Sequence, residues 1–154
     1  MSATLQEACY ENTTAVYMAL ELSNKQWKVL IGDGHHRRHK TVVAGDIAGL
    51  LEQIALFRTK WCVSSEAPVY SCYEAGRDGF WLHRCLLSHG IENVVVDSSS
   101  IKVDQRARRM KTDRLDVKSL HGQLIRYTQG ADDVWRVVHV PSVEDEDRRR
   151  LYRE

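Results

Sequence analysis

The alternation of apolar and polar stretches predicts three strands in the first third of the chain. Residues 15–22 form a short apolar run rich in β-forming side chains, which is typical of a buried strand. Two further candidate strands, 27–31 and 39–43, are separated by the turn sequence Gly-Asp-Gly at 32–34. We therefore expect the fold to begin with three antiparallel strands. Residues 1–13 are polar without a clear period and predict only a loose lead-in.

From residue 45 the pattern changes to helical spacing, and helices then alternate with strands. Apolar side chains recur on one face of 45–61, with Asp46 as a candidate N-cap. The elements expected after it are a strand at 68–73, a helix at 77–89 ended by Gly90, a strand at 91–96, a Ser-rich basic loop at 97–110, a helix at 112–127 capped by Thr112, an extended segment at 134–140 and a charged helix from 142. The order β-β-β-α-β-α-β-α predicts an α/β fold of the RNase H-like type, a mixed sheet of about five strands with helices on both faces.

Overall composition gives no argument for a nucleic-acid partner, but one segment does. The 154 residues suffice for one domain, and 22 Lys and Arg against 21 Asp and Glu give a net charge of +1. Between residues 102 and 118, however, seven basic residues stand against three acidic ones. The basic residues, which we predict to contact nucleic acid, are Lys102, Arg106, Arg108, Arg109, Lys111, Arg114 and Lys118. Arginine grips phosphate bidentately, although a charged run can also be a solvated face.

Cysteine and hydropathy patterns argue against two other classes of protein. The four cysteines form no CxxC pair and match no usual zinc pattern, so Cys62, Cys72 and Cys85 are expected to pack as small hydrophobes. No apolar run approaches a membrane-spanning helix, and no signal-peptide pattern is present. We expect a cytoplasmic protein with reduced thiols and no membrane contact. The histidines near the expected hairpin are interpreted as surface residues rather than metal ligands; they are His35, His36 and His39.

The sequence Lys-Thr-Asp-Arg-Leu-Asp at 111–116 places two carboxylates three residues apart inside the basic segment. In a helix, Asp113 and Asp116 would lie on one face, where their charges repel unless a cation lies between them. A hard divalent cation with oxygen ligands is a common answer. The same pair could instead be a helix-start pattern, since early acids are favoured by the helix dipole.

Two glutamates near strand ends extend this candidate site. Glu21 lies near the end of the first expected strand, and Glu74 follows the fourth. If those strands are parallel neighbours, both ends lie at one edge of the sheet, where α/β folds place ligands. Together with Asp113 and Asp116 they could hold Mg²⁺ or Mn²⁺, with room for two ions. Either glutamate could also be a solvated rim residue.

Several motifs make the chain resemble a known family. They are Tyr-Glu-Ala-Gly at 73–76, Val-Val-Val-Asp at 94–97, Lys-Thr-Asp-Arg-Leu-Asp at 111–116 and Val-His-Val-Pro at 138–141. Over residues 15–154 the chain resembles the DEDD transposases of bacterial insertion sequences, whose N-terminal domain is similar to Holliday-junction resolvases.

The resemblance implies DNA cleavage and strand transfer with a divalent metal. Glu74, Asp113 and Asp116 match the second, third and fourth carboxylates of the family's tetrad. Glu21 stands where the first would be, although most members have aspartate there, and its extra methylene would shift a bound metal. The resemblance also implies DNA as a partner, a structured guide RNA that pairs with donor and target DNA, and a homo-oligomer.

The resemblance also suggests how the chain is organised. Residues 14–140 correspond to the family's N-terminal domain, and 141–154 to the start of a charged helix leading to a second domain that carries a nucleophilic serine. Because that domain is absent from this sequence, we expect the chain alone to be inactive. Two alternatives remain open: a non-catalytic nucleic-acid-binding module or remnant, and a complete resolvase-type nuclease.

Overall fold

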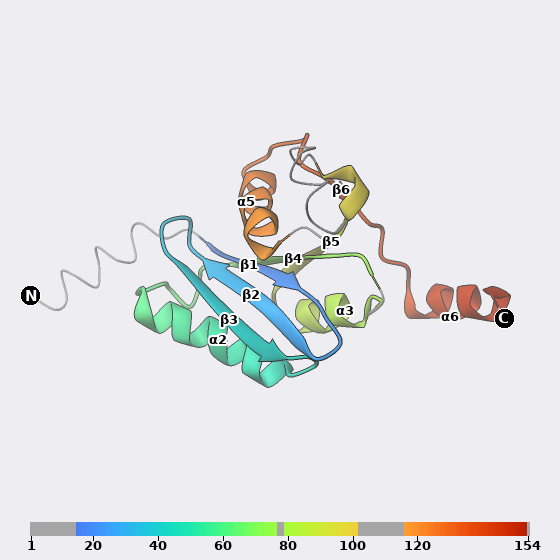
Figure 1. Ribbon diagram of the computed structural model, residues 1–154, viewed down its shortest axis with the longest axis horizontal. Helices are drawn as coiled ribbons and strands as arrows, with labels where there is room; N and C mark the ends of the chain where they lie inside the picture. The colour runs from blue at the N-terminus through green and yellow to red at the C-terminus, as the bar shows by residue number, and fades with distance from the viewer. Residues whose placement is uncertain (1–14, 77–78, 102–115, 154) are drawn as a thin grey trace, which may run out of the picture.

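The computed structural model describes residues 15–76, 79–101 and 116–153, and its centre is a mixed six-stranded sheet (Figure 1). The strand order across the sheet is β3-β2-β1-β4-β5-β6. The strands are β1 (Val16–Glu21), β2 (Gln26–Gly32), β3 (Arg37–Val43), β4 (Val69–Glu74), β5 (Glu92–Asp97) and β6 (Arg136–Val137). β1, β4 and β5 are parallel to one another, whereas β2, β3 and β6 each run antiparallel to a neighbour.

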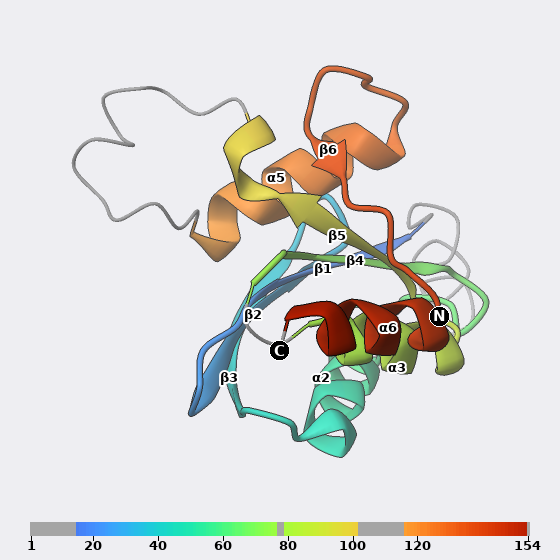
Figure 2. The ribbon, with the colours of Figure 1, turned by 90° about the vertical axis from the view of Figure 1, so that its right-hand side faces the viewer.

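Helices cover both faces of this sheet (Figures 1 and 2). The helices are α2 (Ile47–Lys60), α3 (Trp81–Ser88), α5 (Val117–Thr128) and α6 (Val143–Arg153), with a 3-10 turn, η1 (Ser98–Ser100). On one face, α2 and α3 bury Leu50, Phe57 and Leu86 against the sheet. On the other face, α5 buries Leu120 and Leu124. The molecule thus has two hydrophobic cores separated by the sheet.

This architecture confirms the expected fold class. The three antiparallel strands come first, helices and strands then alternate, and the arrangement is compatible with an RNase H-like fold. Asp46 caps α2 as predicted, because its side chain accepts a hydrogen bond from the Gly49 N–H at 2.9 Å. Gly90, with φ of +77°, follows α3 in the left-handed conformation that glycine favours.

Two predicted helix starts are wrong. α3 begins at Trp81 rather than at residue 77, because Gly79 has a φ of +63° and cannot belong to a right-handed helix. α5 begins at Val117 with Asp116 as its N-cap, not Thr112. The predicted cap Thr112 lies outside the described residues, as do the lead-in 1–13 and most of the basic segment. The extended segment expected at 134–140 forms only the short strand β6.

A buried carboxylate organises the hairpin between β2 and β3. Asp33 accepts hydrogen bonds from the backbone N–H groups of His35 and His36 at 2.8 and 2.6 Å. Its second oxygen lies 3.0 Å from Nδ1 of His36, whose ring stacks on Trp61 with 3.7 Å between centroids. Burial opposes ionisation of Asp33, but the hydrogen bonds from His36 and His35 outweigh it and lower its pKa. As predicted, all three histidines of this region are exposed; the third is His39.

Three of the four cysteines lie among the described residues. Cys72 is buried, whereas Cys62 and Cys85 are only half-buried, and all three are free thiols. Within the described part of the chain, no helix combines the length and the apolar composition needed to cross a membrane.

Candidate functional site

Glu21 and Glu74 are neighbours at the carboxyl edge of the sheet. Each is the last residue of its strand, and both are half-buried. β1 and β4 are parallel, and their register ends with Leu20 opposite Tyr73, so the next pair of positions is Glu21 and Glu74. The register thus brings the two glutamates to one edge of the sheet.

Strand alternation places both glutamates on the face that carries α5. Leu20 and Tyr73 belong to the core under α2 and α3, whereas Ala19 and Cys72 belong to the core under α5. Since successive side chains point to opposite faces, the residues after Leu20 and Tyr73 point toward the α5 face. The electrostatics agree, because burial raises the pKa of the Cys72 thiol and the negative charge of Glu74 raises it further.

Helix α5 crosses this face with its first turn toward the carboxyl edge. Its first residue, Val117, lines a small pocket together with Lys28 on β2, and Lys28 is the register partner of Glu21. One turn later, the Nε2 atom of His121 lies 3.2 Å from the carbonyl oxygen of Tyr17, near the other end of β1. The N-terminus of α5 therefore lies at the level of Glu21.

Asp116 stands at that N-terminus in a structural role. Its backbone is extended, with φ of −71° and ψ of 159°, and its side chain accepts a hydrogen bond from the Ser119 N–H at 2.8 Å. The expectation that Asp116 lies within a helix is therefore wrong, because its backbone is extended and its side chain caps the helix instead. Asp113 lies outside the described residues, so the predicted pairing of the two aspartates stays a prediction.

The described residues do not complete a metal site. Within residues 15–76, 79–101 and 116–153, no three His, Cys, Asp or Glu side chains lie close enough together to hold a metal ion. Glu21 and Glu74 lie on the face where Asp116 begins α5, and the donor atoms of all three are carboxylate oxygens, the chemistry that Mg²⁺ prefers. The described part of the candidate site is thus chemically suited to a divalent cation, without a closed set of ligands.

A fourth carboxylate at this edge has a different role. Asp97 ends β5 and caps η1, accepting hydrogen bonds from the Ser99 hydroxyl at 2.7 Å and the Ser99 N–H at 3.0 Å. These two hydrogen bonds, with a smaller effect of the Arg136 charge, lower the pKa of Asp97. We assign Asp97 to the turn that follows β5 rather than to the candidate site.

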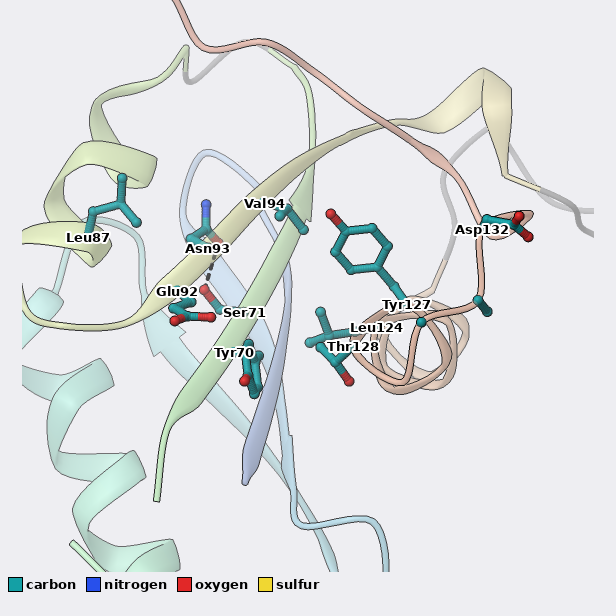
Figure 3. Close-up of a pocket in the computed structure, with 12 residues that line it drawn as sticks. Tyr70, Ser71, Leu87, Glu92, Asn93, Val94, Leu124, Tyr127, Thr128 and Asp132 are labelled. Carbon is teal, nitrogen blue, oxygen red and sulfur yellow. Dashed lines mark hydrogen bonds between the residues drawn. The ribbon is translucent and has the colours of Figure 1, made fainter. Parts of the chain in front are cut away.

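A larger pocket lies away from Glu21 and Glu74, between β4, β5 and the last turn of α5 (Figure 3). It measures about 580 Å³, and Tyr70, Leu124 and Tyr127 give it an apolar wall. Beneath them, the Ser71 hydroxyl donates a hydrogen bond to Oδ1 of Asn93 at 2.6 Å, drawn as a dashed line. Tyr70 precedes Glu74 by four strand residues, roughly 13 Å, so this pocket is separate from the glutamate pair.

Two lysines, one predicted from the sequence and one not, lie near the carboxyl edge of the sheet and the start of α5. Lys118, in the first turn of α5, is exposed, and it is the only predicted nucleic-acid contact among the described residues; the other six lie at 102–114. Lys28 was not predicted, although it pairs with Glu21 across the β1–β2 register. Only the strand pairing, which depends on the tertiary fold, brings Lys28 to the carboxyl edge.

The fold and this edge define a class: an α/β protein with a mixed sheet, compatible with the RNase H-like architecture, that carries paired carboxylates at the ends of two parallel strands. Comparison with curated proteins finds a relative described as "Putative transposase y4rJ" from Sinorhizobium fredii (strain NBRC 101917 / NGR234). The two are 40% identical over 145 residues, which is 91% of this chain. No protein-family model matches the chain, and no solved structure gives a significant match.

The match covers only part of the relative. The chain spans 37% of the length of that relative. The likeness therefore supports a relationship to transposases in general.

Proposed function

We propose that this chain is the carboxylate-bearing domain of a DNA transposase, in which Glu21, Glu74, Asp113 and Asp116 hold Mg²⁺ or Mn²⁺. The observation that carries the proposal is the parallel register of β1 and β4, which makes Glu21 and Glu74 adjacent on the face where Asp116 begins α5. The 40% identity to a protein described as a putative transposase supports the same conclusion.

The donor set fits a site for one or two hard divalent cations. Such cations would supply the positive charge that stabilises the attacking and leaving oxygens of a phosphodiester. Glu21 and Glu74 each directly follow a completely buried residue of the sheet, Leu20 and Tyr73 respectively. The strand ends therefore fix the positions of these carboxylates more firmly than a surface loop would.

The proposed partners belong to the whole transposase. DNA would be cleaved and joined in a homo-oligomer, and a structured guide RNA would select donor and target sites. Strand transfer would require groups beyond the described site, because the proposed role of these carboxylates is to position metal and phosphate.

A second candidate function is a nucleic-acid-binding module without metal chemistry. It is favoured by two observations: Asp116 already uses an oxygen to cap α5, and the described residues contain no three-ligand cluster. A gel-shift series with and without EDTA separates the two candidates. Binding or nicking that requires Mg²⁺ supports the transposase site, whereas DNA binding indifferent to EDTA supports the module.

The direct test is isothermal titration of the chain with Mg²⁺ and Mn²⁺. We expect binding heat from the parent protein and its loss, or at least a tenfold weaker affinity, in Glu74→Gln and Asp116→Asn. Asparagine caps a helix about as well as aspartate, so Asp116→Asn removes the charge while keeping the cap. Asp113→Asn completes the series.

The matched control is Asp46→Asn. Asp46 also caps a helix, accepting from the Gly49 N–H at 2.9 Å, but α2 lies on the opposite face of the sheet. This variant should keep the parent's heat. Equal binding heats in the parent and in all the carboxylate variants would rule out the proposed metal site.

A further inference from the structure

The hairpin formed by β2 and β3 concentrates positive charge beside the glutamate pair. Between residues 26 and 43, the only acidic side chain is Asp33, which is buried and engaged in the turn. The same stretch holds four Lys or Arg residues and three histidines. The charged side chains that reach the surface of this hairpin are therefore basic.

Several of these cations face α5. Leu30 belongs to the α5 core, and Lys28 lies two residues before it on β2, so both point to the same face. His39 pairs with Leu30, and Arg37 lies two residues before His39 on β3. The pKa of His121 on α5 is lowered mainly by burial and further by the charges of Arg37 and His39, in keeping with the face that the register gives these two residues.

A pocket joins this face of the hairpin to the start of α5. It measures about 270 Å³ and is lined by Lys28, Val29, His39, Lys40, Thr41 and Val117. Because Lys28 is the register partner of Glu21, the pocket adjoins the carboxyl edge. Lys118, exposed in the same turn as Val117, adds a further cation.

Near β5 and the last turn of α5, by contrast, the exposed charges are of both signs. Glu92 begins β5, Asp132 and Asp133 follow α5, and Arg126 lies 3.4 Å from Asp133. On the hairpin, no exposed acidic side chain offsets the basic ones, so a polyanion would be attracted more strongly to the hairpin.

We propose that Lys28, Arg37 and His39, the basic hairpin face, bind the phosphodiester backbone of a nucleic acid and lead it to the Glu21–Glu74 edge. Lys28 and the register partner of Arg37 are four residues apart on β2, which is roughly 13 Å. This distance corresponds to about four nucleotides of one strand along the axis of a duplex. The contacts are to phosphate, so they set position and affinity without reading sequence. This binding role rests on the proposed function, because it assigns the hairpin a part in bringing nucleic acid to the proposed metal site.

The test measures the salt dependence of binding in EDTA, so that metal plays no part. Fluorescence anisotropy of labelled duplex DNA, single-stranded DNA and RNA of one length is recorded over a salt series for the parent and for the double variant Lys28→Gln/Arg37→Gln. Each lost phosphate contact lowers the slope of log K against log salt by about 0.7 to 0.9. We expect a slope shallower by about 1.5 and weaker binding to every sequence tested.

The matched control is Arg126→Gln. Arg126 is exposed on the last turn of the same helix that carries Lys118, 3.4 Å from Asp133, and its loss should leave the slope unchanged. The single variants Lys28→Gln and Arg37→Gln are measured as well, in case the double variant loses its circular dichroism spectrum. Either backbone, DNA or RNA, supports the proposal if its slope responds to the hairpin variants.

The outcomes separate this inference from the metal site. A slope that changes in EDTA supports the basic hairpin face even if the carboxylate variants leave the Mg²⁺ heat unaltered. A folded double variant whose slope and affinity match the parent's for all three nucleic acids overturns the inference, whatever the metal titration shows.

Discussion

His121 ties α5 to the sheet through an unusually close approach. Its Nε2 atom contacts the Tyr17 carbonyl, and its ring packs against Gly32, where an added Cβ would lie 2.8 Å from the imidazole. Only glycine leaves room for this ring at that point of β2. The imidazole is buried, and burial is the main reason that its pKa falls to about 4.

We predict that stability falls as the pH drops from 6.5 toward 4. The unfolded chain takes up a proton on His121 in this range while the folded chain does not, so acid favours unfolding. The expected loss for one such histidine is at most about 1.4 kcal/mol per pH unit. Urea unfolding followed by circular dichroism at pH 7.5, 6.0 and 4.5 measures it.

The comparison variant is His121→Gln, which can still donate to the Tyr17 carbonyl. It should unfold with a shallower dependence on pH across this window. An unchanged pH dependence would mean that other groups, and not His121, cause the loss of stability at low pH.

Sequence patterns could identify Glu21, Glu74 and Asp116 as candidate metal ligands, because acidic residues at strand ends and near helix starts can be recognised from the sequence alone. They could not identify His121 or Lys28. Each acquires its role from a partner distant in the chain, Gly32 and Tyr17 for His121, and the β1–β2 register for Lys28.

Among the elements, α6 is attached to the rest of the molecule through α3 (Figure 2). Arg84 Nη1 lies 2.7 Å from Glu146 Oε2, and its Nη2 atom donates to the Pro141 carbonyl at 2.9 Å. One guanidinium therefore holds both the segment before α6 and its first turn. Beyond that turn, Leu151 is 74% exposed.

We predict that Arg84→Leu releases α6 without unfolding the sheet. Both ionic groups are partly exposed, so the effect on global stability should be about 1 kcal/mol or less. Hydrogen exchange should accelerate in α6 while β1 and β4 keep their protection. Leu87→Ala, at an exposed position of α3, the helix that carries Arg84, serves as the control. Unaltered hydrogen exchange in α6 of Arg84→Leu would show that Arg84 does not hold α6 in place.

The elements themselves were largely predictable, and their boundaries were not. β1, β2, β4 and β5 each contain an apolar run, and Asp46 caps α2 where the pattern places it, whereas β3 begins with a run of polar residues that the apolar pattern does not reveal. The start of α5 was misplaced because Thr112, Asp113 and Asp116 are all good caps by local preference. The choice falls to Asp116 through packing, since Val117 and Leu120 are buried against the sheet.

For the whole molecule, the separation into two cores matters most. One core joins α2 and α3 to the sheet, and the other joins α5, which carries Asp116. The order of elements along the chain was sufficient to predict helices on both faces. It could not predict how closely the carboxylates approach one another, because that depends on the seating of α5.

We predict that the two cores respond separately to truncation. Leu120→Ala and Leu86→Ala each remove a fully buried leucine and should cost about 2 to 5 kcal/mol. Hydrogen exchange should accelerate mainly in α5 for Leu120→Ala and mainly in α3 for Leu86→Ala. If both variants loosen both helices equally, the molecule has a single cooperative core instead.

The outermost position of β3 gives its basic residues another consequence. An edge strand offers unpaired N–H and C=O groups to any other strand, and charged side chains are a usual defence against such pairing. Arg37, Arg38 and Lys40 make two edges of this kind repel each other, while at the other side of the sheet β6 is only two residues long. The charges on β3 therefore discourage two sheets from joining edge to edge into aggregates.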